Sequence, residues 1–147
     1  MLATAGFFGI HTCLKIISLT CSQSLGLIKS ITSYQSINHY DELNKLLLRT
    51  DMKQKIVKIQ QMLSDIQPTK VKECIKTAIF DLHETIKNIN TLLEECITIN
   101  TNHKQLWFHA WRTVDMNQPI NKLQIYNDIL NQRFDDLVKL TTIVLYI

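Results

Sequence analysis

The stretch from Val71 to Cys96 contains an unbroken series of apolar residues spaced four and three apart. Its members are Val71, Ile75, Ala78, Leu82, Ile86, Ile89, Leu93 and Cys96. This spacing is typical of an amphipathic α-helix with one buried face. At ~1.5 Å per residue, a helix of about seven turns is roughly 40 Å long and needs neighbours of similar length to cover that face.

Three further segments show helical periodicity, so the sequence predicts an all-α fold. The expected long helices span residues 2–33, 41–66, 70–99 and 119–146, with a short aromatic helix at 103–112 before the last long one. The apolar series slips near Thr50 and Asp51, which predicts a bend in the second helix. Because the connections are short, we expect one domain, residues 1–147, built as an antiparallel up-down-up-down four-helix bundle. The last helix has no cap, so we also expect the natural chain to continue beyond Ile147.

The first segment, residues 2–33, is apolar around its whole circumference. Lys15 divides it into uncharged runs shorter than the ~20 residues that span a bilayer. A secretory signal would need a basic region before the apolar stretch, and none is present. Three interpretations remain open: an ordinary bundle helix, a helix that also enters membranes, and a secretory signal, which the missing basic region disfavours.

Charge is unevenly distributed along the chain. Between Met1 and Tyr40 there are two lysines and no acidic residue. Between Met52 and Lys76 there are two acidic residues, Asp65 and Glu73, and six lysines. The lysines are Lys53, Lys55, Lys58, Lys70, Lys72 and Lys76. These lysines form either a solvated surface or a basic surface that meets anionic lipid headgroups or an acidic partner. A net charge of +3 is too small to indicate nucleic acid by itself, and we expect no nucleic-acid partner.

No residue pattern indicates catalysis. The sequence has no glycine-rich phosphate loop, and His83-Glu84 lacks the second histidine of a zinc protease motif. No CxxC pair occurs, and same-helix cysteines are too far apart for a disulfide, so we expect thiols that act as small hydrophobic residues in a reducing cytosol. These thiols are Cys13, Cys21, Cys74 and Cys96. We therefore expect a cytoplasmic protein that is not an enzyme and has no cofactor and no metal ion.

Aromatic residues cluster just before the last predicted helix. Trp107, Phe108 and Trp111 are interleaved with Lys104 and Arg112. This combination is found where proteins stack single-stranded bases or anchor at a membrane interface. The other interpretation is a hydrophobic plug that closes one end of the bundle.

The order of features resembles the HeLo and HeLo-like four-helix bundles, which include the N-terminal domain of the mixed-lineage kinase domain-like pseudokinase and its fungal and plant relatives. The resemblance is one of pattern and covers nearly the whole chain. It begins with a glycine-containing apolar first helix (residues 5–10, then 25–29). A long third helix ends in Leu92-Leu93-Glu94-Glu95-Cys96. A short polar-aromatic insert follows, and then a last helix with a recurring apolar pattern. That pattern comprises Leu123, Ile129, Leu130, Phe134 and Leu137.

The resemblance implies a non-enzymatic bundle that oligomerises and binds or permeabilises membranes in regulated cell death or immune defence. It implies recruitment to anionic membrane lipids on activation, a homo-oligomer when active, and control by a kinase, NTPase or receptor domain on a longer chain. The membrane-inserting residues would be Gly6, Phe7, Phe8, Gly9, Ile10, Leu14 and Ile17. The lipid-headgroup ligands would be Lys53, Lys55, Lys58, Lys70, Lys72 and Lys76.

Two other functions fit a helical bundle of this kind. One is an adaptor that binds a partner helix in a surface groove and never contacts lipid. The other is a secreted cytokine-like bundle, which would need cleavage after the first segment and cysteine pairing between helices.

Overall fold

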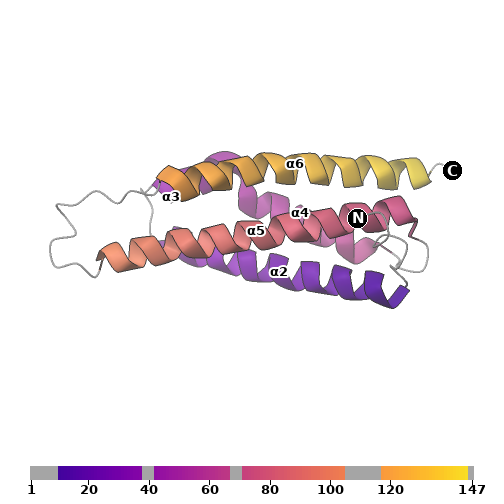
Figure 1. Cartoon of the computed structure of the whole chain (residues 1–147), viewed down its shortest axis with the longest axis horizontal. Coiled ribbons are helices and arrows are strands. Elements are labelled where there is room, and N and C mark those ends of the chain that lie inside the picture. The colour runs from indigo at the N-terminus through magenta and orange to yellow at the C-terminus, as the bar shows by residue number, and fades with distance from the viewer. Residues whose placement is uncertain (1–9, 38–41, 67–70, 105–116, 146–147) are drawn as a thin grey trace.

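The protein is helical in nearly every part that the structure describes. The computed structural model describes residues 10–37, 42–66, 71–104 and 117–145 (Figure 1). Within these ranges only Asp51, Ile66, Val71 and Lys72 lie outside helices, and no strand occurs. The predicted all-α class is confirmed.

Five helices occupy the described ranges. They are α2 (Ile10–Ile37), α3 (Glu42–Thr50), α4 (Met52–Asp65), α5 (Glu73–Lys104) and α6 (Asn117–Leu145). Helix α5 continues past the polar run at residues 100–102, where the sequence predicted its end. Of the predicted aromatic helix at 103–112, residues 103 and 104 belong to α5, and the remainder lies outside the described residues.

The predicted apolar face of α5 faces the core. Val71 is half-buried, and the other seven members of the series are at most 9% exposed. The same core receives Leu43, Leu46 and Leu47 from α3, and Met52, Ile56, Ile59 and Leu63 from α4. From α6 it receives Leu123, Leu130 and Leu137. This shared burial holds the helices together, because apolar area removed from water contributes ~25 cal/mol per Å².

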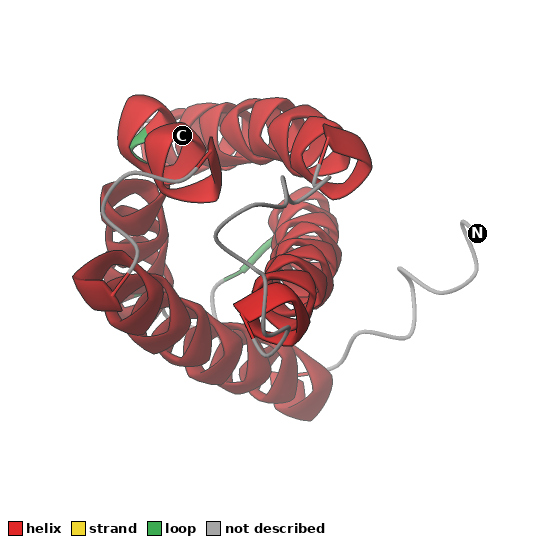
Figure 2. Ribbon diagram, turned by 90° about the vertical axis from the view of Figure 1, so that its left-hand side faces the viewer, coloured by secondary structure: helices red, strands yellow, loops and turns green. Residues whose placement is uncertain are grey.

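The helices surround a common axis, as the end-on view shows (Figure 2). Helix α2 packs against α4 and α5, while α6 packs against α5 and α3. Three hydrogen bonds join α2 to α5: Thr20 to His83, the Gln23 carbonyl to Asn90, and Tyr34 to Asn100. Residue numbers rise together along both helices, so α2 and α5 are neighbours that run in the same direction.

The predicted bend in the second helix is a full interruption at Asp51. Its backbone adopts φ 51° and ψ 39°, the left-handed conformation, and it is the one non-glycine residue with positive φ in the described chain. Asparagine and aspartate adopt this conformation more readily than most residues. The interruption separates α3 from α4 and allows the buried series to restart at Met52.

Candidate functional site

Helix α2 has one face in the core and one face open to solvent. Its buried residues step by four and three along the helix: Cys13, Ile17, Thr20, Ser24, Leu27, Ile31 and Tyr34. Thr20 and Ser24 are fully buried, and their hydroxyls donate to the carbonyl oxygens of Ile16 and Thr20 at 2.6 and 2.7 Å. These bonds satisfy the two buried hydroxyls and fix which side of α2 faces inward.

The opposite side of α2 is apolar and basic. Leu14, Leu19 and Leu25 are 46%, 44% and 47% exposed, and α2 contains no aspartate or glutamate. We define the α2 surface as the exposed residues Leu14, Lys15, Ser18, Leu19, Ser22, Leu25, Gly26 and Lys29. At 100° per residue these positions cover an arc of about 140°. The α2 surface therefore combines half-exposed leucines with positive charge and has no carboxylate to repel an anionic partner.

Small residues lie along the middle of the α2 surface. Ser18, Ser22 and Gly26 are spaced four apart and lie on one side of the helix. A Cβ atom added at Gly26 would meet nothing within 4 Å. The protein's own described packing therefore does not require a glycine at this position.

The predicted membrane-inserting residues divide between the core and the surface. Gly6, Phe7, Phe8 and Gly9 lie outside the described residues, as does the side chain of Ile10. Leu14 is exposed, whereas Ile17 is 9% exposed and packs in the core. Of the two members whose side chains are described, one is therefore exposed and one is buried.

Of the six predicted headgroup ligands, Lys70 lies outside the described residues. The other five are divided between α4, α5 and the residue before α5. Lys53 and Lys55 are both half-buried and are ~200° apart around α4, on opposite flanks of its buried face. Lys58 on α4 and Lys72 before α5 are exposed.

Two of these lysines have partners inside the protein. The Lys55 Nζ donates to Asn127 Oδ1 on α6 at 3.2 Å, and burial lowers the pKa of Lys55, opposed by Asp51 and Asp128. The Lys76 Nζ lies 3.0 Å from Glu73 Oε1. Neither ammonium is available to a headgroup without losing that contact.

The sequence-based site prediction included only Leu14 of the α2 surface and missed the other seven residues, among them Leu19, Leu25, Lys15 and Lys29. Lys15 and Lys29 are the two lysines of the acid-free region between Met1 and Tyr40. That charge asymmetry, together with leucines all around the helix, was the available signal. It identified the helix but not which of its faces would be exposed.

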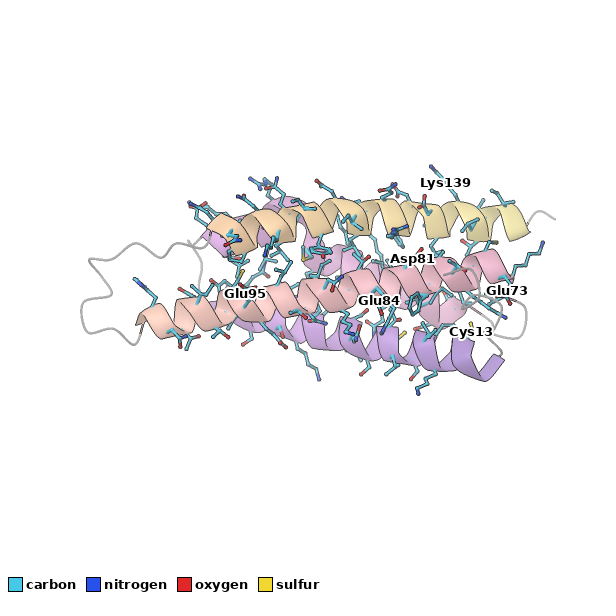
Figure 3. All side chains as sticks on the ribbon, in the orientation of Figure 1. Cys13, Glu73, Asp81, Glu84, Glu95 and Lys139 are labelled. Carbon is cyan, nitrogen blue, oxygen red and sulfur yellow. The ribbon has the colours of Figure 1, made fainter. Side chains whose placement is uncertain are left out.

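The four cysteines are free thiols. Cys13 and Cys96 are buried, Cys21 is half-buried, and Cys74 is exposed. Cys13 lies at the same end of the molecule as Glu73 (Figure 3). Burial raises the pKa of the Cys13 thiol; Lys76 opposes this with a smaller effect, and Glu73 adds to it. A protonated, buried thiol of this kind behaves as a small apolar residue.

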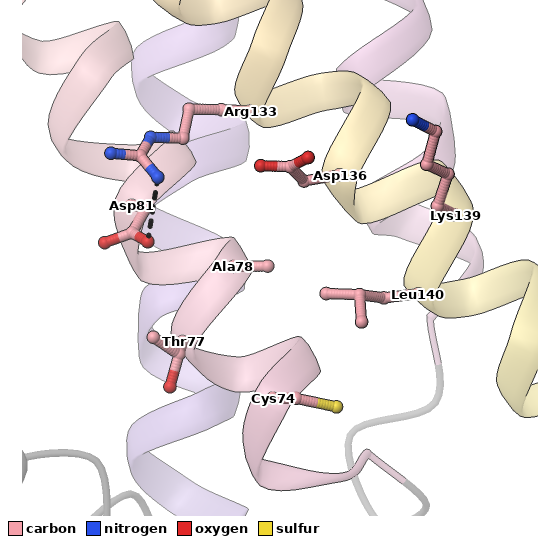
Figure 4. Close-up of a pocket in the computed structure, with 8 residues that line it drawn as sticks. All are labelled: Cys74, Thr77, Ala78, Asp81, Arg133, Asp136, Lys139 and Leu140. Atoms are coloured by element: carbon pink, nitrogen blue, oxygen red, sulfur yellow. Dashed lines mark ion pairs between the residues drawn. The ribbon is translucent and has the colours of Figure 1, made fainter.

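A second surface feature is a groove along the contact between α5 and α6. It consists of two hollows of about 360 and 440 Å³, one beside Asp81 and Arg133 and the other beside Asn88 and Tyr126. Arg133 reaches across the groove to Asp81, with Nη1 and Oδ2 at 3.5 Å, and Asp136 lies on the same wall (Figure 4). We call this the α5–α6 groove.

The described residues contain no cluster of three or more histidine, cysteine, aspartate or glutamate side chains that could hold a metal ion. None of the described helices is both long and apolar enough to cross a membrane.

Comparison with known proteins identifies one similar sequence. The chain is similar to a protein of Acanthamoeba polyphaga mimivirus, the uncharacterized protein L717. The two are 26% identical over an aligned length of 153 residues, which covers 85% of this chain and 72% of the viral protein. No protein-family model matches the chain, and no solved structure matches it.

Proposed function

We propose that this protein is a non-enzymatic helical bundle that binds anionic membrane surfaces through the α2 surface. The observation that supports this function is the exposure of Leu14, Leu19 and Leu25 on a helix that contains lysines but no carboxylate. Half-exposed leucines gain from burial at the headgroup boundary, and each lysine near an anionic surface contributes ~1 kcal/mol. Two lysines and three leucines make this a weak and reversible attachment.

The proposed architecture is a four-helix bundle in which α3 and α4 together form one interrupted helix. The directions of α2, α3–α4, α5 and α6 in Figure 1 support an up-down-up-down order. In this arrangement α2 and α5 are parallel neighbours, and consecutive helices run in opposite directions.

The bundle is proposed to bind the membrane with α2 still in place. Insertion of α2 would remove Cys13, Ile17, Leu27, Ile31 and Tyr34 from the core. Large apolar side chains such as these contribute about 1.5–3 kcal/mol each, and the sum is as large as the ~5–15 kcal/mol that stabilises a typical domain. Permeabilisation by α2 in cell death or defence, which the HeLo-like resemblance implies, would therefore require a trigger that releases α2 from the core.

Vesicle binding of residues 1–147 tests the proposal. We expect co-sedimentation with vesicles that contain phosphatidylserine and little with pure phosphatidylcholine, declining as salt is raised. The double variant Leu14→Glu/Leu25→Glu should lose at least about ten-fold in affinity, because it places carboxylates where leucines met the headgroups.

The matched control is Leu48→Glu, which alters a leucine that is 63% exposed on α3. This variant should bind vesicles as the unmodified protein does. Equal binding of the Leu14→Glu/Leu25→Glu variant and the unmodified protein would contradict the role of the α2 surface.

The second candidate function is the adaptor, in which the α2 surface binds a helix of another protein. The observation that favours it is the strip of Ser18, Ser22 and Gly26, whose lack of bulk allows close approach of a helix. A protein that ignores anionic vesicles at low salt would favour the adaptor over the membrane function.

A further inference from the structure

Four residues of the wall that α6 contributes to the α5–α6 groove are placed symmetrically in the sequence, and two isoleucines of α6 extend the pattern at its ends. Arg133 and Asp136 are centred between residues 134 and 135, and so are Ile129 and Leu140. Ile125 and Ile143 are centred half a residue away and are 58% and 55% exposed. From the centre outward, α6 therefore presents a charged pair of opposite sign, then two half-buried apolar residues, then two exposed isoleucines.

All six residues lie on one side of α6. At 100° per residue their positions fall within an arc of about 80°, on the side that borders the groove. From Ile125 to Ile143 this stripe is ~27 Å long. A stripe with this symmetry matches a second copy of itself that runs in the opposite direction.

Arg133 and Asp136, at the centre of this stripe, form no short ion pair with the described residues of their own copy of the chain. The Arg133–Asp81 contact of 3.5 Å is longer than the ~2.7–2.9 Å of a strong charge-assisted hydrogen bond, and both side chains are partly exposed. Asp136 is half-buried and makes no ion pair or hydrogen bond with any described residue. Arginine has five donors, so Arg133 can keep Asp81 and still bind a second carboxylate.

We propose that the α5–α6 groove binds a second copy of this chain, with the two α6 helices antiparallel about a two-fold axis that passes between Phe134 and Asp135. In this dimer Arg133 of each copy meets Asp136 of the other, and Ile129 meets Leu140. Ile125 and Ile143 cover the two ends of the same stripe. Because one patch is used by both copies, the interface is closed and self-complementary.

The dimer is expected to be weak. A single pair of helices ~27 Å long buries less than the ~800 Å² per partner of a standard stable interface. Sedimentation velocity on residues 1–147 should therefore cover concentrations from about 10 µM to 1 mM. A monomer throughout this range would overturn the proposal.

Charge exchange tests the pairing of Arg133 with Asp136. Arg133→Glu and Asp136→Arg each convert two attractive contacts into two repulsive ones and should raise the dissociation constant at least about ten-fold. The double variant Arg133→Glu/Asp136→Arg restores opposite charges and should return to within a factor of about three of the unmodified protein. The control Asp135→Arg changes an exposed neighbour on another side of α6 and should have no effect. A double variant as weak as the single variants would overturn the pairing.

Crosslinking tests the register independently. In a Cys74→Ser background, which removes the exposed thiol, Ile129→Cys/Leu140→Cys should form covalent dimers with a thiol crosslinker ~8 Å long. Within one chain these two positions are ~16 Å apart, so they cannot crosslink to each other. Ile129→Cys alone should form no covalent dimer, since in this register the two copies of position 129 in the dimer lie ~16 Å apart along the helix axis. Equal crosslinking of the single and double variants would overturn the register.

Discussion

Thr20 on α2 and His83 on α5 share a hydrogen bond of 3.2 Å between Oγ1 and Nδ1. The Thr20 hydroxyl already donates to the Ile16 carbonyl oxygen at 2.6 Å, so it accepts here and His83 Nδ1 holds the proton. Thr20 is fully buried, and the Phe80 ring lies with its centroid 6.4 Å from that of His83. An ionisable ring is therefore built into the contact that holds α2 against α5.

Stability should fall at mildly acidic pH because of His83. Burial lowers the pKa of His83 below its ordinary value of ~6.5, with Glu84 opposing the shift and Lys87 adding to it. The unfolded chain then binds the proton more readily than the folded protein does. The contribution of neutral His83 to the free energy of unfolding is therefore complete above pH ~6.5 and is lost as the pH falls below this value. Urea unfolding at pH 7.5 and 5.5 measures this loss. His83→Gln should lose less stability over the same interval, and an equal loss in both proteins would contradict the assignment.

Lys55 and Asn127 should behave as a coupled pair in a double-mutant cycle. Asn127 is 4% exposed and accepts from Lys55 Nζ, so Asn127→Ala leaves a half-buried ammonium without this acceptor. We expect a loss of ~1–3 kcal/mol in the free energy of unfolding. Lys55→Met/Asn127→Leu replaces both partners with apolar groups and should lose less than Asn127→Ala, as measured by urea denaturation. Strict additivity of the single variants Lys55→Met and Asn127→Leu in this double variant would show that the pair is not coupled.

The helical framework was predictable from the sequence, because burial and periodicity depend on the same residues. Ile75, Leu82 and Ile89 recur at the helical period and are all buried. The interruption near Asp51 was also predictable, since the apolar series restarts there.

Surface assignments required the structure, for two physical reasons. A helix with leucines all around it, such as α2, does not specify which leucines face solvent, and Leu14 and Ile17 differ in exposure for that reason. Lys53 and Lys55 are close in sequence yet lie on opposite flanks of α4. A lysine-rich segment therefore does not show by itself which lysines share one surface. The pairing of Lys55 with Asn127 joins positions 72 residues apart, which no local pattern contains.

Asp51 should tolerate glycine and reject a β-branched residue. Its φ of 51° costs a glycine nothing, and its side chain makes no capping hydrogen bond that the change would remove. Asp51→Gly is expected to stabilise the protein by ~0.5–1 kcal/mol, whereas Asp51→Val should destabilise it by ~1–3 kcal/mol. Thermal unfolding of the two variants would show this as opposite changes in Tm. A lower Tm for Asp51→Gly would mean that the Asp51 charge outweighs the backbone effect, since this carboxylate also raises the pKa of Lys55.

Gly26 should separate the two proposed functions of the α2 surface. A glycine in a helix interior costs ~1 kcal/mol relative to alanine, and a Cβ at Gly26 would meet nothing within 4 Å. Gly26→Ala should therefore stabilise the protein and raise its Tm by roughly 2–4 °C, as measured by calorimetry.

Gly26→Leu adds apolar area to the face that meets lipid, so binding to phosphatidylserine vesicles should be unchanged or stronger. The same leucine would fill the strip beside Ser18 and Ser22, which a close-packed partner helix needs to be empty. Loss of vesicle binding in Gly26→Leu, with the fold intact by circular dichroism, would contradict the membrane function.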